Sequence, residues 1–528
     1  MLAFLEPLEE LADYQEIVRK RGKAEGILQI AGCVSSQKTH LMYALGDGFE
    51  YRVIVFSSEE KAKQAYEEYK MLEENTFLYP AKDLLFYHAD IKGAALTGKR
   101  MEVLKKLTEK KNREPVTVIT TADAFLDGLP SKEKLWESRI EIEAGAVIDF
   151  QKLQEELVHL GYERESQIEG PGQFAVRGGI LDVYPLTEEI PVRIELWGDE
   201  IDSIRSFDVE SQRSVENMEQ VVIYPATENV EKEEQAVSFA EYFPKEKSLF
   251  FFDEPVRLQE TLEAVEKEYF HSFESRKNAG MTEEADEIRV FQTKEIIEKF
   301  NTRYGIGLTT LETRCGGFKV RDVYSIQAAG VNPYNNSFEM LTQDLKKLKR
   351  QGYRVILVSG SRTRAKRLAE DLRDYDLSSF YSEDMVRTVR PGEIMVVYGC
   401  VAEGYEYPML KFMVISESDI FGKRKKKVYE GQKIQEFAEL KPGDYVVHEN
   451  HGLGVYQGIE KVEVDKVTRD YMKISYADGG ILYILATQMD LIQKYAGADA
   501  KPPKLNKLGT PQWNKTKSQV KKAVQVIA

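Results

Sequence analysis

The chain has 528 residues, of which 42% are hydrophobic and 30% charged, and its formal net charge is −15 at pH 7. This length predicts several domains, and the acidic balance argues against a surface covered with nucleic-acid contacts. The chain has no long apolar run, no signal-peptide pattern at its acidic start, and only three widely spaced cysteines, Cys33, Cys315 and Cys400. These features predict a cytoplasmic protein without a membrane span, a disulfide framework or a zinc site.

Residues 1–130 have an α/β pattern, in which apolar strands alternate with amphipathic helices. The clearest elements are a strand, a helix and a second strand, at 51–58, 59–74 and 116–121. Residues 138–224 differ, because short alternating strands dominate after one helix at about 150–161. The change of pattern predicts a second domain that is rich in β-strands.

The rest of the chain continues with three further patterns. Residues 225 to about 300 are mostly helical around the very apolar strand "SLFFFDEP" at 248–255. Residues 331–422 are again α/β, with a helix at 337–350 before a strand at 353–360. The basic stretch "GKRKKK" (422–427) predicts an exposed linker, and residues 438–497 are compact and β-rich.

The stretch "GCVSSQKT" nearly matches the phosphate-binding loop G-x-x-x-x-G-K-[ST]. Gly32 begins it and Lys38 and Thr39 end it, but Gln37 replaces the second glycine. In a working loop that glycine keeps side chains out of the space where backbone N–H groups surround the phosphate. Gln37 therefore compromises the loop, although the lysine and threonine are retained.

A phosphate loop also needs an acidic residue at the end of a buried strand, to complete a magnesium site. "LFFFDEP" offers Asp253 and Glu254 in that role. Phosphoryl transfer usually needs an arginine finger as well, which helicases carry in a Gly-Arg motif, and the chain contains no Gly-Arg dipeptide. We interpret Gly32, Lys38, Thr39, Asp253 and Glu254 as a degenerate nucleotide site, with no catalytic residue and no metal.

Two other groups of residues suggest recognition or metal binding. His448 and His451 are three residues apart, but the turn-like "ENHGLG" favours a structural role over a metal site. Arg164, Phe174 and Arg177 flank a Gly-Pro-Gly turn, and arginine and aromatic side chains are enriched at interface hot spots. An ordinary hairpin with solvated arginines explains the same residues equally well.

The final 28 residues, 501–528, contain seven lysines and no acidic residue, so the rest of the chain has a charge of −22. Such a tail favours contact with DNA or with an acidic partner. A solvated linker helix is an equally good interpretation.

Several stretches resemble the transcription-repair coupling factors (the Mfd family) and the related damage-recognition protein UvrB. "GPGQFAVRGGILDVYP" and "FDVESQRS" are similar to the UvrB-like module of that family, and "LFFFDEP" to its version of the helicase strand. "VISESDIFGKRKK" resembles the end of its third domain. "LKPGDYVVHENHGLGVYQGI" resembles its RNA-polymerase-interaction domain, which is CarD-like, and "KLGTPQWNKTKSQVKKAV" the segment before its motor. The resemblance extends over essentially the whole chain.

The resemblance implies a multidomain α/β fold. It comprises a RecA-like α/β domain with an inserted α+β domain that binds UvrA, a second α/β domain, and a small Tudor-like β-barrel. In chain order, the UvrB-like domain has its first segment at 1–137, the inserted UvrA-binding domain at 138–224 and its second segment at 225–330. The third domain with its basic linker follows at 331–427, the polymerase-interaction domain at 438–497 and a basic linker helix at 498–528.

The resemblance also implies partners. Arg164 and Arg177, with Phe174 beside them, match positions at which UvrB binds UvrA, although a third UvrB arginine is replaced by Ala175. The polymerase-interaction domain is expected to pair an edge strand with the β subunit of RNA polymerase. Residues Ile459, Val462 and Val464 would make that contact, unless Val462 is a core residue of the barrel.

The family motor is a superfamily 2 translocase on double-stranded DNA, and it is expected to follow residue 528 and to supply ATP, Mg²⁺ and DNA binding. This chain is then a scaffold that needs no cofactor of its own. Two alternatives are an ATP-dependent helicase that acts alone, and a UvrB protein that binds damaged DNA. The second would insert an aromatic hairpin, but residues 84–101 offer only Phe86 and Tyr87.

Overall fold

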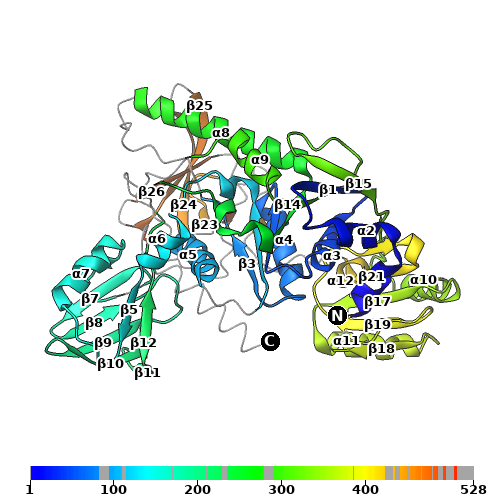
Figure 1. The fold of residues 1–528 in the computed structure, drawn as a ribbon, viewed down its shortest axis with the longest axis horizontal. Helices are drawn as coiled ribbons and strands as arrows, with labels where there is room; N and C mark the ends of the chain where they lie inside the picture. The colour runs from blue at the N-terminus through cyan, green and yellow to red at the C-terminus, as the bar shows by residue number, and fades with distance from the viewer. Residues whose placement is uncertain are drawn as a thin grey trace. The chain divides into compact units, whose positions relative to one another are not determined.

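The computed structural model describes residues 2–82, 94–109, 114–168, 170–209, 211–228, 235–278, 290–383, 386–422, 432–433, 441–448, 451–464, 467–477, 480–485, 492–494 and 505–507. They fall into two compact units (Figure 1). The first holds most of residues 2–422, and the second holds residues 270–278 and those from 432 onward. Phe86, Tyr87 and most of the basic stretches at 422–427 and 501–528 lie outside the described residues. Within the described part of the chain, no helix combines the length and apolar character that a membrane crossing requires.

A seven-stranded, fully parallel sheet forms the core of the first unit. In spatial order its strands are β15 (Val320–Ser325), β1 (Gly26–Ala31), β14 (Tyr304–Thr309), β13 (Ser248–Asp253), β2 (Tyr51–Phe56), β4 (Val116–Thr121) and β3 (Thr76–Tyr79). Every residue of β1, β2, β4 and β13 is buried, because a parallel sheet is covered on both faces. The strands predicted at 51–58, 116–121 and 248–255 are confirmed.

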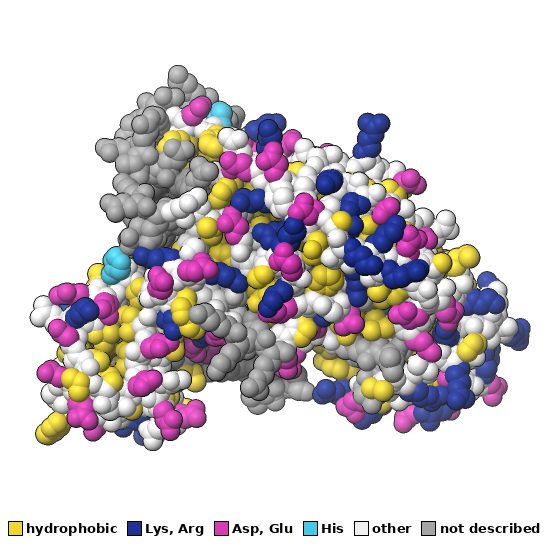
Figure 2. Space-filling view, viewed as in Figure 1, with side chains coloured by type: hydrophobic (Ala, Val, Ile, Leu, Met, Phe, Trp, Pro, Cys, Tyr) yellow, Lys and Arg dark blue, Asp and Glu magenta, His cyan; other side chains and the backbone are white. Residues whose placement is uncertain are grey.

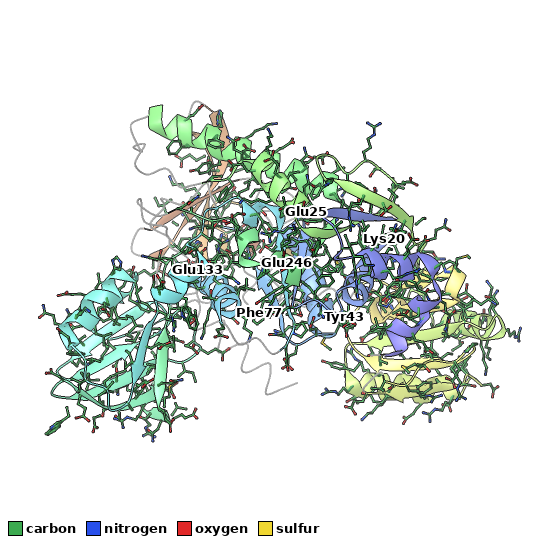
Figure 3. The ribbon with its side chains drawn as sticks, viewed as in Figure 1. Lys20, Glu25, Tyr43, Phe77, Glu133 and Glu246 are labelled. Atoms are coloured by element: carbon green, nitrogen blue, oxygen red, sulfur yellow. The ribbon has the colours of Figure 1, made fainter. Side chains whose placement is uncertain are left out.

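Helices flank this sheet. They are α1 (Leu2–Leu5), α2 (Ala12–Lys20), α3 (Ser35–Leu45), α4 (Glu59–Lys70), α5 (Ala94–Thr108), α6 (Lys132–Glu137), α8 (Pro255–Asn278) and α9 (Thr293–Asn301). The helix predicted at 59–74 is therefore confirmed, and it ends at Lys70. Lys20, at the end of α2 (Figure 3), forms an ion pair with Asp322 of β15 at 3.2 Å and so ties the first residues of the chain to the sheet edge.

A smaller domain follows α6, and its strands pair antiparallel except for β6 and β7, which are parallel. Its elements are β5 (Ile140–Glu143), α7 (Phe150–His159), β6 (Glu163–Arg164), β7 (Gln173–Arg177), β8 (Ile180–Val183), β9 (Val192–Trp197), β10 (Glu200–Phe207), β11 (Ser214–Met218) and β12 (Gln220–Ile223). Strands β6 to β11 form one sheet in chain order, while β5 pairs with β12. The side chain of Asp149 caps α7, whose Leu153 and Leu157 pack on the sheet. The helix predicted at about 150–161 is confirmed.

A buried ion cluster joins the segment that follows β12 to the parallel-sheet region. The guanidinium of Arg100, on α5, donates to both carboxylate oxygens of Glu228 at 2.9 and 2.8 Å and to Asp127 at 2.5 Å. It also lies 4.4 Å from the centre of the Tyr79 ring. All three charged side chains are nearly inaccessible to solvent, so each depends on the others for its charge compensation.

Residues 329–422, called the third domain below, form a second α/β layer. Its elements are β16 (Ala329–Gly330), α10 (Phe338–Arg350), β17 (Arg354–Ser359), α11 (Arg362–Arg373), β18 (Ser379–Ser382), β19 (Ile394–Tyr398), β20 (Tyr405–Tyr407), β21 (Phe412–Ser416) and α12 (Glu417–Phe421). The sheet order is β16-β20-β21-β17-β19-β18, parallel among its last four strands. The predicted helix at 337–350 and strand at 353–360 are confirmed.

Alternation along β17 gives this sheet two different faces. Val355 and Leu357 pack with apolar residues of α10 and α11, which form the outer layer of the domain. Ile356 and Val358 point the other way and join the core cluster that contains Leu41 of α3. The third domain therefore shares a continuous core with the parallel-sheet region.

The second unit is an antiparallel sheet in the order β22-β27-β23-β24-β25-β26. Its strands are β22 (Gln432–Lys433), β23 (Tyr445–His448), β24 (Gly452–Val464), β25 (Val467–Ser475), β26 (Ile481–Leu485) and β27 (Ile492–Lys494). On one side of β24, β23 pairs with residues 452–455 and no further. On the other side, β25 pairs with β24 as far as Val464. Among the described strands, the far half of β24 thus has a neighbour on one side only.

Candidate functional site

The residues of the predicted phosphate loop lie between the end of β1 and the first turn of α3. Gly32 has a φ of +84°, in the left-handed region that favours glycine. A Cβ atom at this position would also meet the carbonyl oxygen of Ile326 at 3.3 Å. The first glycine of the motif is therefore required by the backbone itself, whether or not a phosphate binds.

Gln37 occupies the place of the second glycine and fills the loop from inside. Its Oε1 accepts a hydrogen bond from the N–H of Val34 at 3.0 Å. The neighbouring N–H of Cys33 donates to the carbonyl oxygen of Thr309 at 3.1 Å. In a working loop such N–H groups face phosphate oxygens. Here two donors of the loop are already satisfied within the protein, one by Gln37 and one by Thr309 of β14.

Lys38 is the centre of a buried ion-pair network, and the structure brings it together with both predicted acidic residues. Its Nζ lies 2.5 Å from Oδ1 of Asp253 and 2.7 Å from Oε1 of Glu254. Asp253 is only 3% exposed and also pairs with Lys61 at 3.2 Å. Glu254 further accepts hydrogen bonds from the N–H and hydroxyl of Thr310. The lysine that would bind phosphate and the carboxylates that would hold magnesium thus neutralise one another.

The pKa shifts of this network favour its charged form. Burial alone would lower the pKa of Lys38, but attraction by Asp253 and Glu254 outweighs burial and raises it. Burial alone would raise the pKa of Glu254, but hydrogen bonds from Lys38 and Thr310 outweigh it and lower the pKa. The lysine and glutamate therefore both keep their charges at neutral pH.

Third-domain backbone covers the first turn of α3. The hydroxyl of Ser36 donates to Oε1 of Glu68 at 2.7 Å and accepts from the N–H of Glu403 at 3.2 Å. The N–H of Ala402 donates to the same Glu68 oxygen at 2.9 Å. Glu68 and the loop at 402–403 therefore use the polar groups of this turn. A magnesium-bound nucleotide does not fit this set of already satisfied groups.

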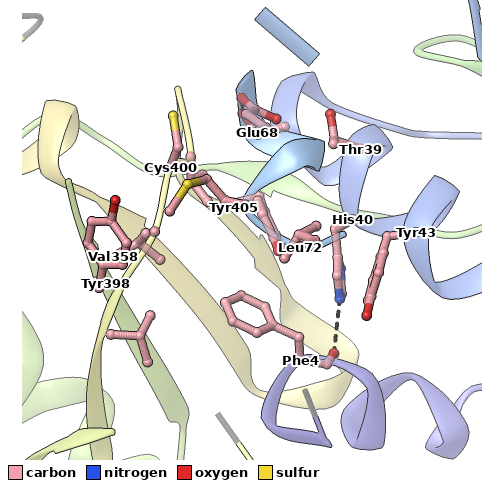
Figure 4. A pocket seen from close by; sticks show the side chains of 15 residues that line it. Phe4, Thr39, His40, Tyr43, Glu68, Leu72, Val358, Tyr398, Cys400 and Tyr405 are labelled. Carbon is pink, nitrogen blue, oxygen red and sulfur yellow. Dashed lines mark hydrogen bonds between the residues drawn. The ribbon is translucent and has the colours of Figure 1, made fainter. Parts of the chain in front are cut away.

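A small pocket lies where the ends of β17 and β19 approach α3 and α4 (Figure 4). Its volume of about 30 Å³ is that of a few water molecules at most. His40 lines it, donates through Nε2 to the carbonyl oxygen of Phe4 at 2.9 Å and accepts through Nδ1 from the hydroxyl of Tyr407 at 3.0 Å. Burial lowers the pKa of His40 to about 4, so the ring is neutral. The pocket is a packing feature of the shared core.

The rings of His448 and His451 lie 4.7 Å apart between their centres. Within the described ranges, no group of three His, Cys, Asp or Glu side chains could hold a metal ion. Burial lowers the pKa of His451, which favours its neutral form. This geometry gives the histidine pair no metal-binding set among the described residues.

The three residues predicted to bind UvrA differ in their exposure to solvent. Arg164 is exposed on β6, opposite Phe174 of β7. Phe174 is 0% exposed and belongs to the domain core, so it supports β7 rather than offering its ring to a partner. Arg177 lies three residues beyond Phe174, where side chains leave the opposite face of the sheet, and its side chain is 49% exposed. Both arginines lie at the β6–β7 edge.

The sequence interpretation did not identify Asp182, the residue that positions Arg177. Its Oδ2 accepts from Nη2 of Arg177 at 3.1 Å, and its two oxygens also accept from Arg193 at 2.7 and 2.9 Å. The Arg193 guanidinium lies 4.4 Å from the centre of the Phe207 ring. Asp182 is buried and lies directly across from Arg193 in the sheet. An acidic residue inside the apolar run "ILDVYP" was the available signal.

The residues predicted to bind RNA polymerase all lie on β24. Ile459, Val462 and Val464 pair with Met472, Arg469 and Val467 of β25. Ile459 is 47% exposed. These three positions fall on the half of β24 that has only one described neighbour.

Comparison with known proteins identifies two matched segments. Residues 140–229 match the family described as the UvrB interaction domain, and residues 440–496 match the CarD-like/TRCF RID domain. Over 99% of its length the chain is 27% identical to the transcription-repair-coupling factor of Bacillus subtilis (strain 168), of which it covers 49%. It is 30% identical, over 86% of its length, to those of Staphylococcus aureus strains MRSA252 and USA300, of which it covers 44%. The chain thus spans about half the length of the curated relatives it matches.

Proposed function

We propose that this chain, a homologue of the transcription-repair-coupling factors over their N-terminal portion, is a recruitment scaffold of transcription-coupled nucleotide excision repair. One observation carries the proposal: a UvrB-type interaction domain and a CarD-like polymerase-interaction domain occur in one chain. The scaffold holds RNA polymerase through the second unit and UvrA through the first. Its affinities come from surfaces, and it makes or breaks no covalent bond.

The UvrA surface in this proposal is the β6–β7 edge. Arg164 and Arg177 both project from this edge, and Asp182 holds Arg177 in a fixed orientation. A fixed arginine loses little side-chain entropy when a partner binds, which favours its use as an interface anchor. The proposal assigns Phe174 a supporting role inside the domain.

The polymerase surface in this proposal is the far half of β24. A strand with an unpaired edge offers backbone N–H and C=O groups to another strand, and the side chains beside that edge determine specificity. We assign the contact to a strand of the polymerase β subunit, with Ile459, Val462 and Val464 as the apolar residues beside it. The Tudor-like closure of this unit into a barrel belongs to the same proposal.

A bridging experiment tests the scaffold. RNA polymerase is immobilised, the chain is added, and retention of UvrA is measured. We expect Arg164→Ala with Arg177→Ala to reduce UvrA retention by at least about 10-fold, as loss of interface hot spots does, without reducing retention of the chain. We expect Ile459→Asp with Val462→Asp to release the chain from polymerase.

The exposed Arg213, on the same domain as Arg177, provides the matched control as Arg213→Ala. Wild-type UvrA retention by the Arg164/Arg177 variant would remove the UvrA assignment, and polymerase binding by the Ile459/Val462 variant would remove the β24 assignment. Direct capture of UvrA by the immobilised chain is measured as well, and here we expect the Ile459/Val462 variant to bind UvrA as the wild type does. General misfolding of that variant is then recognised by the loss of both activities.

The proposal assigns no cofactor to this chain. Within the family, ATP hydrolysis, Mg²⁺ and translocation along double-stranded DNA belong to a separate motor, and the loop at 32–39 takes no part. The Lys38 ion pairs and the Gln37 hydrogen bond support this assignment.

Calorimetry with Mg²⁺ and ATP tests that assignment. We expect no binding heat from the wild-type chain at micromolar to millimolar nucleotide, because a phosphate would have to separate Lys38 from two carboxylates. Micromolar binding by the wild-type chain would contradict the scaffold interpretation and favour a helicase that acts alone. The control is a phosphate-loop ATPase measured under the same conditions.

A further inference from the structure

The outer layer of the third domain is basic, in contrast to the rest of the chain. α10 and α11 together contain nine Lys or Arg residues and four Asp or Glu residues, a net charge of +5 in a chain whose net charge is −15. Figure 2 shows Lys and Arg side chains gathered at the lower right, over the region of these two helices in Figure 1. This layer lies outside both segments that the family comparisons match.

The cations of α10 have a structural explanation. Lys347, Lys349 and Arg350 lie in its last turn, where the negative end of the helix dipole attracts positive charge. Lys349 also donates to the hydroxyl of Ser378 at 3.0 Å. These residues stabilise the helix, so their charge requires no partner outside the chain.

Four of the five cations of α11 are at the opposite end of their helix, and only Arg373 lies in its last turn. Its first two turns contain four cations and no acidic residue, namely Arg362, Arg364, Lys366 and Arg367. At this end the helix dipole is positive, so it repels Arg362 and Arg364 in the first turn and stabilises none of the four. Helix stability therefore does not explain the cluster, and a local rule broken without a structural gain is a sign of function.

One of the four cations has a clear internal role. Arg364 pairs with Glu417 at 2.8 Å. Glu417 in turn accepts hydrogen bonds from the N–H of Gly360 and the hydroxyl of Ser359, which fixes the loop before α11. Arg364 is thus part of the domain's framework.

The other three cations face solvent. Arg362 and Arg367 have side chains that are 65% and 82% exposed, and their nearest carboxylates, Glu383 and Asp371, lie at 3.5 and 3.9 Å. Such exposed pairs contribute little to stability. The guanidinium of Arg362 lies 4.9 Å from the Tyr398 ring centre, so its orientation is restricted while its charge stays accessible.

We propose that Arg362, Lys366 and Arg367, called the α11 cation surface, bind the phosphate backbone of nucleic acid. The three side chains are exposed and spread over more than one helical turn, which suits an extended polyanion better than a single phosphate enclosed by converging donors. The apolar residues of α11 are all buried in the domain core, namely Ala365, Leu368, Ala369 and Leu372. The helix has no apolar face left to insert into a membrane.

The binding is expected to be independent of base sequence. Tyr398 and Tyr381 each have a cation over the ring, Arg362 at 4.9 Å and Lys366 at 5.3 Å from the ring centres. Those ring faces are occupied and do not stack on bases. Contacts limited to phosphates fix position on a duplex without reading its sequence.

Fluorescence anisotropy with a labelled DNA duplex at several salt concentrations tests the proposal. The test variant of the full chain is Arg362→Gln with Lys366→Gln and Arg367→Gln. The slope of log K against log salt is negative, and each lost phosphate contact reduces its magnitude by about 0.9. We therefore expect the magnitude to decrease by about 2–3 in the variant, and the affinity at 50 mM salt to fall at least about 10-fold. The wild-type slope also includes any contribution of the lysine-rich tail, and the difference between the proteins isolates the α11 cation surface.

A second variant loses the same charge from exposed sites elsewhere on the first unit. It is Lys63→Gln with Lys152→Gln and Lys247→Gln, three lysines in surface ion pairs. We expect its salt slope to equal that of the wild type. Equal losses in both variants, or no loss in either, would overturn the proposal. So would binding of labelled polyglutamate tighter than binding of the duplex, which would assign the surface to an acidic protein partner.

Discussion

Replacement of Arg100 by methionine is expected to lower the free energy of unfolding of the first unit by about 3–5 kcal/mol, which is the usual cost of breaking a buried ion cluster. Methionine keeps much of the arginine's length but removes its charge and its donors. Glu228 and Asp127, both nearly inaccessible, would then be buried without compensation. The Tyr79 ring would also lose the cation that lies 4.4 Å from its centre.

Urea denaturation followed by intrinsic fluorescence measures this effect. Arg213→Met, at an exposed position, is the matched control and is expected to change stability by less than about 0.5 kcal/mol. Adding Asp127→Asn and Glu228→Gln to the Arg100 variant removes the uncompensated charges and is expected to recover part of the loss. An unchanged urea midpoint for Arg100→Met would show that the cluster does not stabilise the fold.

Replacement of Lys38 by methionine is the second large effect, and we expect a loss of about 3 kcal/mol at pH 7. The change leaves Asp253, which is 3% exposed, with the partly exposed Lys61 as its remaining cation, and Glu254 with Thr310 alone. The triple variant with Asp253→Asn and Glu254→Gln is expected to be more stable than the single variant. A single variant as stable as the wild type would mean that the Lys38 ion pairs contribute no net stability.

The effect of Lys38→Met should depend on pH in a defined direction. The folded-state pKa of Glu254 is lowered, so its contribution is fully present above the ordinary glutamate pKa of about 4.3 and is lost as pH falls through the lower folded value. The folded-state pKa of Lys38 is raised, so its contribution is present below the ordinary lysine pKa of about 10.4 and is lost as pH rises through the higher folded value. Stability measured against pH should therefore show the largest difference between the proteins between these two limits.

The sequence predicted the location of the candidate nucleotide site better than its chemistry. Motif spacing and one apolar strand were enough to place Lys38 near Asp253 and Glu254, because parallel strands bring their carboxyl ends to one edge of a sheet. The internal use of Gln37 was not predictable. It depends on the rotamer that brings its side chain back to the N–H of Val34, and this is a property of packing.

Strand β14 of the central sheet was not identified from the sequence, for a physical reason. Its sequence "YGIGLT" contains two glycines, which normally argue against a strand interior. A Cβ at Gly305 would lie 2.8 Å from Cγ2 of Ile27, and one at Gly307 would lie 3.0 Å from Cδ1 of the same residue. The glycines are needed because a neighbouring side chain occupies the space of a Cβ atom. That neighbour is distant in the sequence, so the local pattern cannot identify it.

Phe174 illustrates a similar limit at the predicted interface. The sequence predicts that strands dominate residues 138–224, but it cannot say which face of a strand at Phe174 is turned to the core. The structure places Phe174 in the core with α7, and leaves Arg177 on the other face with Asp182. The arginine, and not the ring, is therefore the residue to alter when the interface is tested.

The pairing of β1 with β14 has a consequence for the synthesis of the protein. Gly26 lies beside Tyr304, so β1 must wait for about 280 further residues before its neighbour leaves the ribosome. At about 5–20 residues per second this delay is roughly 15–60 s. During that time a strand that is fully buried in the folded protein has no permanent partner. The domain between β5 and β12, in contrast, has all of its strands within 84 consecutive residues and can fold first. The newborn chain therefore depends on protection of its first strand against aggregation, a demand that ends only when β14 has emerged.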